Sequence, residues 1–310
     1  MTAIPAQITA DVVAAKLKGE RADIAGVAFR FLLFACLGIV LAALIALIAT
    51  VSGEGIPYLF GERGLADFLN RPGFSEPEFA GVYQALVGTI SMAVIIAVVA
   101  FPLGVAAALY LEEYASDTFI TRTVSVIIRN LAGVPAVVYG LLGAGIFVNS
   151  RLGGATGGET LLSAGLTLAV LVLPIVVITS AEALRAVPAS LREGGFGAGA
   201  TRWEVVRTLV LPNAFPGILT GTILSLARAL GEAAPLILLG AKTSFGGGDW
   251  GDIRGNFTAL PNLINGWAKL PESQGWEPNK QAAILVTLVV ILGINAVGII
   301  LRNRFEKKSR

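Results

Sequence analysis

Six blocks of apolar residues, separated by shorter polar stretches, set the pattern of this chain. A helix needs about 20 mostly apolar residues to cross roughly 30 Å of hydrocarbon, because it rises about 1.5 Å per residue. Each block meets that length, so the pattern predicts an all-α integral membrane protein with about six transmembrane helices. Pro102 and Pro135 lie inside the second and third blocks and predict kinks there. The six predicted spans are residues 31–51, 85–109, 124–148, 160–180, 216–240 and 281–301.

The distribution of Lys and Arg predicts how the chain is oriented. Placing the N-terminus inside the cell puts 15 of the 23 basic residues in cytoplasmic segments and seven in the opposite loops. Basic residues favour the cytoplasmic side, so both termini are predicted to be cytoplasmic. The predicted organisation is a cytoplasmic tail (1–30), a first transmembrane helix (31–51), a periplasmic loop (52–81), a transmembrane domain (82–301) and a basic cytoplasmic tail (302–310).

Composition removes several classes of function. Charged residues make up only 14% of the 310 residues, whereas a soluble domain carries about 25%. The chain has no histidine and one cysteine, Cys36, which leaves few groups for general-base catalysis or a metal site. The net charge of +2 is too small to indicate nucleic-acid binding. We therefore expect a protein of the lipid bilayer without catalytic residues, metal ligands or a bound cofactor.

Polar residues near the ends of the blocks have ordinary explanations. Glu112 and Glu113 follow the second block and are predicted to be a solvated pair that ends a helix. Trp250, Trp267 and Trp276 lie in the last outer loop, and tryptophan near a span end usually anchors the chain at the membrane surface. None of these residues indicates a site.

The cytoplasmic loop before the fifth block predicts two short helices. Ser190 to Glu193 and Thr201 to Glu204 each fit the hydroxyl-x-x-Glu capping box, in which the side chains satisfy free backbone donors. Glycine costs about 1 kcal/mol in a helix, so the glycines between the two boxes predict a flexible turn. Such a protruding turn is either a docking element for a soluble partner or a plain connector. These glycines are Gly194, Gly195, Gly197 and Gly199.

The fifth block carries a polar stripe. Steps of three and four residues keep side chains on one helix face, and five small or charged residues follow that spacing. The first two form a Gly-x-x-x-Gly pattern, which allows another helix to approach closely. An ionised arginine near mid-bilayer costs at least about 2.5–3.5 kcal/mol against lipid, so Arg228 should face protein or water, with Glu232 as its counter-ion. The pair is either a salt bridge that locks the bundle or a waypoint for an anion. The stripe consists of Gly217, Gly221, Ser225, Arg228 and Glu232.

The loop resembles a known motif. In this chain Glu193 is followed by two glycines, three residues, Gly199, nine residues and then Leu209-Val-Leu-Pro212. The spacing is similar to that of the EAA loop of type I ABC importer permeases, with glycines in place of two alanines and leucine in place of isoleucine. The resemblance implies a type I ABC importer permease fold and a loop, about residues 182–212, that couples to a separate ATPase. The implied coupling residues are Glu193, Gly194, Gly195, Gly199, Ala200 and Thr201.

Further segments indicate which group of these permeases the chain resembles. Residues 227–236, which end in Glu-Ala-Ala-Pro-Leu, are similar to the segment after the EAA loop in PstA-type permease subunits of phosphate ABC importers. Residues 130–141, residues 258–268 and Asn295 with the basic tail also resemble that family, over about residue 82 to the end. The resemblance implies that Arg228, Glu232 and Ser225 line a path for inorganic phosphate.

The same resemblance implies partners and a location. These partners are a PstC-like second permease, a PstB-like ATPase dimer that binds ATP and Mg²⁺, and a PstS-like periplasmic phosphate-binding protein. The implied location is the bacterial inner membrane. Two alternatives remain open: a type I ABC permease for another oxyanion, such as molybdate or sulfate, and a secondary transporter driven by an ion gradient through Arg228 and Glu232.

Overall fold

The computed structural model describes residues 24–73, 76–149, 153–241 and 252–308. Over these residues every regular element is helical and no strand is present. The chain divides into two compact units, Met1–Val51 and Ser52–Arg310. The described part of the first unit belongs to α2 (Ile24–Pro57), whose side chains from Val27 to Thr50 are exposed. A helix that is apolar all round is suited to lipid. This helix is longer at both ends than the predicted span.

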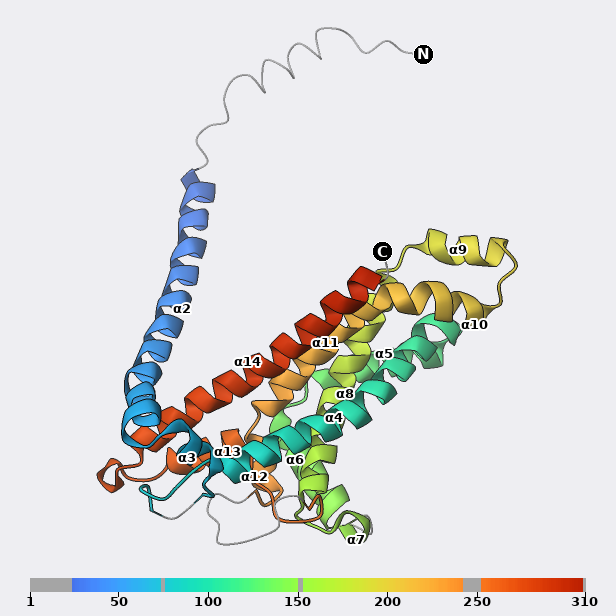
Figure 1. Cartoon of the computed structure of the whole chain (residues 1–310). Coiled ribbons are helices and arrows are strands. Elements are labelled where there is room, and N and C mark those ends of the chain that lie inside the picture. The colour runs from blue at the N-terminus through green and yellow to red at the C-terminus, as the bar shows by residue number, and fades with distance from the viewer. Residues whose placement is uncertain (1–23, 74–75, 150–152, 242–251, 309–310) are drawn as a thin grey trace. The chain divides into compact units, whose positions relative to one another are not determined.

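Four long helices form the body of the second unit (Figure 1). α4 packs along α8, α8 along α11, and α11 along α14. Among the described residues, five helices are long and apolar enough to cross a membrane, and a sixth span results if one bent pair counts as one. Pro102 and Pro174 lie inside unbroken helices. The long helices are α4 (Tyr83–Leu109), continued by the π-helical η2 (Tyr110–Tyr114), α8 (Leu161–Arg185), α11 (Leu211–Leu230) and α14 (Glu277–Lys308).

The third predicted span is broken rather than kinked. Its two parts, α5 (Phe119–Ala132) and α6 (Ala136–Gly143) with the π-helical η3 (Ala144–Val148), meet at an angle of 101°. Pro135 disfavours a helical conformation at the residue before it, so the helix ends near Gly133. The Leu131 carbonyl, whose helical donor four residues on would be Pro135, accepts hydrogen bonds from the Val134 N–H (3.0 Å) and, across the break, from the Tyr139 hydroxyl (2.8 Å).

The fifth predicted span also ends early. α10 (Arg202–Val205), the π-helical η4 (Val206–Val210) and α11 form one helix that stops at Leu230, and the chain resumes as the short α12 (Ala234–Leu238). α12 packs on α6 so closely that a Cβ at Gly140 would lie 2.7 Å from the Pro235 Cα. The two helix breaks of the unit are therefore linked by direct packing.

The remaining short helices gather away from α9 (Ala189–Gly197) and α10, at the opposite end of the unit (Figure 1). There Trp267 and Trp276 are buried and stacked, with ring centroids 5.3 Å apart. The prediction that these two residues anchor the membrane surface is wrong, because they fill a core with Phe68 and Leu260. Trp250 lies outside the described residues. The short helices are η1 (Tyr58–Glu62), α3 (Leu65–Asn70), α7 (Gly153–Thr156), α13 (Leu260–Trp267) and η5 (Glu272–Gln274).

We predict that Gly104→Ala destabilises the helix body. A Cβ at Gly104 would lie 2.6 Å from the Cγ1 of Val176, a buried and stiff side chain on α8. Overpacking of this kind costs about 1–3 kcal/mol, so the thermal unfolding midpoint of the detergent-solubilised protein should fall. Gly293→Ala is the matched control, because no heavy atom lies within 4 Å of its added Cβ. Equal midpoints for the two variants would contradict the packing of α4 on α8.

Candidate coupling and translocation site

The loop that resembles the EAA motif, about residues 182–212 and called the EAA loop from here on, folds as the short helix α9 and the start of the long α10–η4–α11 helix, joined by one tight turn. Thr201 caps α10 by accepting a hydrogen bond from the Glu204 N–H, while the Glu204 carboxylate accepts one from the Thr201 N–H at 2.7 Å. This capping box was predicted from the sequence and is confirmed. The turn before it depends on Gly199, whose φ of 82° lies in the left-handed region that favours glycine.

Two other predictions for the loop are wrong. α9 starts at Ala189 after Pro188, so Ser190 lies inside the helix and forms no capping box. Gly194, Gly195 and Gly197 are helical instead of interrupting the helix. Gly195 has a packing reason, because a Cβ there would lie 2.8 Å from both Leu209 and Val205 side chains. The absence of a side chain allows α9 to lie close against α10 and η4, and this contact stabilises the helix that glycine weakens.

The outer surface of the loop carries two exposed aromatic residues. Phe196 is 50% exposed and Trp203 is 54% exposed. Glu193, Gly194, Gly199 and Thr201 are also exposed, whereas Ala200 is half-buried. Aromatic residues are enriched at protein interfaces. Neither aromatic residue was among the predicted coupling residues, although Phe196, a single phenylalanine among glycines, was a signal for this surface.

Glu112 and Glu113 are not a solvated pair. Glu112 accepts hydrogen bonds from Arg185 at the end of α8, and the buried Glu113 pairs with Arg192 of α9 at 2.7 Å. The prediction failed because the partners lie more than 70 residues away in the sequence. These acidic residues attach η2 to the EAA loop.

The five residues of the predicted polar stripe do not share one helix face. Glu232 lies beyond the end of α11, so it does not share a helix face with Arg228. No ion pair joins the two among the described residues. Ser225 is buried, and its hydroxyl donates to the Gly221 carbonyl at 2.7 Å. Gly217 and Gly221 lie where α11 packs on α8, against Ala183 and Thr179.

Arg228 is exposed, although it lies beside the middle of the helix body. Its neighbours Ala229 and Leu230 belong to the same buried cluster as Ile96 of α4 and Val172 of α8. Arg228 also immediately precedes the break between α11 and α12. A cation at this depth should face water or another protein chain rather than lipid.

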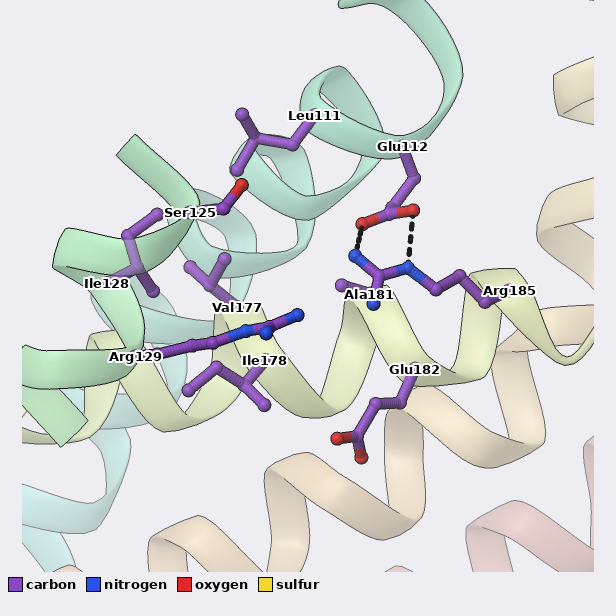
Figure 2. A pocket seen from close by; sticks show the side chains of 10 residues that line it. All are labelled: Leu111, Glu112, Ser125, Ile128, Arg129, Val177, Ile178, Ala181, Glu182 and Arg185. Atoms are coloured by element: carbon purple, nitrogen blue, oxygen red, sulfur yellow. Dashed lines mark hydrogen bonds and ion pairs between the residues drawn. The ribbon is translucent and has the colours of Figure 1, made fainter. Parts of the chain in front are cut away.

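A second arginine lines a pocket between α5, η2 and α8. Figure 2 shows the Arg129 side chain extending into this pocket of about 390 Å³, which the Arg185–Glu112 pair borders. Ser125 and Glu182 also line it. Arg129 falls within the predicted third span (124–148), and it lies on α5 one turn before the helix break. The amphipathic pattern of residues 119–132 was the signal for this helix.

Comparison with known proteins identifies the family. The profile of the binding-protein-dependent transport system inner membrane components matches residues 100–310. The chain belongs to this family. It is accordingly a multi-pass protein of the bacterial inner membrane.

Two relatives match about three quarters of this chain and of their own length. The phosphate transport system permease protein PstA of Mycobacterium leprae is 37% identical over 73% of this chain and 72% of its own. PstA 1 of Mycobacterium tuberculosis (strain H37Rv) is 38% identical over 75% of this chain and 73% of its own. Among solved structures, a bacterial alginate ABC transporter superposes with a TM-score of 0.60 over 90% of this chain and 97% of its own, at 16% identity. This likeness confirms the ABC importer permease fold.

We predict that Gly199→Val loosens the EAA loop of this permease. A residue with a Cβ costs about 1–2 kcal/mol in the left-handed region, which corresponds to roughly tenfold faster opening. Amide hydrogen exchange over residues 200–205 should therefore accelerate by about that factor. Gly197→Ala is the control, since its added Cβ meets no atom within 4 Å in a helical backbone. Unchanged exchange in Gly199→Val would show that the turn does not hold the loop.

Proposed function

We propose that the chain is the permease subunit of an ATP-driven importer of inorganic phosphate. The observation that carries this proposal is the 37–38% identity, over about three quarters of the chain, to permeases named for phosphate transport. The EAA spacing supports coupling to an ATPase. The complete importer would contain a PstC-like second permease, a PstB-like ATPase dimer and a PstS-like periplasmic binding protein. ATP and Mg²⁺ would bind to the ATPase subunits, and this chain would carry neither a cofactor nor a catalytic residue.

The EAA loop is the proposed docking element for the ATPase. Phe196 and Trp203 give it an apolar surface, and Glu193 and Thr201 surround that surface with polar groups. Exposed aromatic residues of this kind are the usual anchors of an interface, because they bury a large area at low entropic cost. Closure of the ATPase dimer would push the two docked loops and open the path outward, as alternating access requires.

We propose that phosphate passes Arg228. The guanidinium group presents several donors in a planar fork that suits an oxyanion, and no residue of the described chain neutralises it with an ion pair. Non-helical backbone at membrane depth is tolerated where it lines a cavity, and both helix breaks lie close to this position. Half-buried Glu232 would moderate the positive potential so that phosphate can leave.

Arg129 extends the proposed path toward the cytoplasm. Its pocket lies on the side of the α5–α6 break that leads to the EAA loop. Ser225 contributes to helix packing in this proposal rather than to the path, because its hydroxyl is buried and already hydrogen-bonded.

Phosphate uptake should fall at least tenfold in Arg228→Ala, because the variant removes the positive charge of the proposed path. Neither lipid nor hydrogen-bonded helix backbone offers phosphate a donor at this position. The measurement is binding-protein-dependent uptake of labelled phosphate by the complex in proteoliposomes, with Arg228→Lys expected to retain part of the activity. Arg122→Ala is the control, because Arg122 is exposed and pairs only with Asp117. Wild-type uptake by Arg228→Ala would exclude the path role. Uptake of molybdate or sulfate instead of phosphate, or uptake without ATPase subunits, would contradict the proposed function.

Removal of the loop aromatics should release the ATPase. We expect Phe196→Ala with Trp203→Ala to lower the amount of ATPase that co-purifies with the permease by about tenfold or more, since two anchors of roughly 1–2 kcal/mol each are lost. Phe119→Ala is the matched control, because Phe119 is 83% exposed but lies on α5, outside the loop. Full retention of the ATPase by the double variant would place the docking surface elsewhere.

A further inference from the structure

We propose that η2, the π-helical end of α4, is the element through which movement of the EAA loop reaches the transmembrane helices. In this proposal Glu112, Glu113 and Tyr114 are positioning residues for coupling. The inference rests on the proposed function of the chain as an importer permease.

Three consecutive residues of η2 hold three successive parts of the loop region. Glu112 accepts hydrogen bonds from Nε (2.8 Å) and Nη2 (2.5 Å) of Arg185, at the end of α8. Glu113 pairs with Arg192 of α9 at 2.7 Å. The ring of Tyr114 lies under the guanidinium of Arg202 of α10, 5.3 Å from its centroid. Successive side chains of a helical turn point in different directions, so this one turn reaches all three parts.

The contact between Glu113 and Arg192 is the most buried of the three. The side chain of Glu113 is 9% exposed and that of Arg192 is 23% exposed. Arg192 also donates hydrogen bonds to the Leu184 carbonyl (2.9 Å) and the Val187 carbonyl (2.8 Å), which lie at the C-terminal end of α8. One guanidinium therefore joins α4, α8 and α9. A buried charge pair of this kind resists separation, because either partner alone would be left unpaired.

The α4–α8 pair is suited to carry a displacement further. The two helices pack without room for a side chain at Gly104 or at Gly165, which lies against Ile95. A close-packed pair transmits strain instead of absorbing it. Its far end reaches the buried cluster that surrounds the α11 break next to Arg228. The Glu112–Arg185 pair also borders the Arg129 pocket, so its displacement would change the cytoplasmic side of the proposed path (Figure 2).

The test uses the complete reconstituted complex with its ATPase and binding protein. Glu113→Gln keeps the shape of the side chain and removes its charge. We expect this variant to retain the ATPase subunits in wild-type amount, to hydrolyse ATP independently of the binding protein, and to lose at least tenfold in phosphate taken up per ATP. A merely structural role would lower assembly and would not change the ratio of uptake to hydrolysis.

A charge exchange gives a second measurement that does not depend on Glu113. Glu112→Arg and Arg185→Glu should each reduce uptake per ATP, and the double variant should restore at least half of it. Asp117→Asn is the control, because Asp117 lies near η2 and, among the described residues, forms its ion pair with Arg122 of α5 rather than with an arginine of the loop. The hydrogen bond from Arg122 lowers the pKa of the Asp117 carboxyl, so this carboxyl is ionised at neutral pH. The control substitution therefore also removes one negative charge.

The outcomes separate the inference from the proposed function. Wild-type coupling in Glu113→Gln, or loss of the ATPase from that variant, would overturn the role of η2, as would a double variant no better than the single ones. A wild-type complex that moves no phosphate would instead contradict the proposed function, before any variant is compared.

Discussion

The structure depends on one constraint: inside hydrocarbon, each backbone polar group and each charge needs a partner within the protein or water beside it. Continuous helices meet this constraint along most of α4, α8 and α14. Where a helix breaks, partners have to be supplied locally, as the Val134 N–H and the Tyr139 hydroxyl do for the Leu131 carbonyl. Three hydroxyls buried in the helices follow the same rule, since Thr89, Thr167 and Ser225 donate to carbonyls four residues before them, whereas the Ser180 hydroxyl of α8 is buried without a hydrogen-bond partner.

The same constraint explains why two arginines without an ion-pair partner are significant. Arg228 and Arg129 lie beside helix breaks and have no ion-pair partner among the described residues. A lone cation at such a position is costly against lipid, so each one marks a surface that water or a second permease must cover. In the proposed importer, both requirements would be met by a path at the interface of this chain and a second permease. The packing of α6 on α12 holds the two helix breaks close together.

The sequence predicted the features that follow from local patterns. Apolar length predicted the spans, and the Thr201–Glu204 capping box predicted the start of α10. It could not predict features that depend on contacts distant in the chain. Gly194, Gly195 and Gly197 have poor intrinsic helix propensity, and packing of α9 on Val205 and Leu209 overrides it. The end of α11 at Leu230 had a local signal in Gly231 and Pro235, but the apolar residues from Leu236 to Leu239 extended the predicted span past it. Glu113 seemed solvated because its partner is 79 residues away.

The arginines around the EAA loop carry a further consequence. Basic residues in this region predicted its cytoplasmic side, but Arg185 and Arg192 form ion pairs with η2, and Arg202 stacks on Tyr114. The exposed surface of the loop combines the aromatic residues Phe196 and Trp203 with the charged Glu193 and Arg207. An apolar contact of this kind holds a partner by buried area, whereas the charge pairs behind it keep a defined geometry. In the proposed importer, binding and force transmission would thus fall to different residues of one loop, so the ATPase could stay attached while the loop moves.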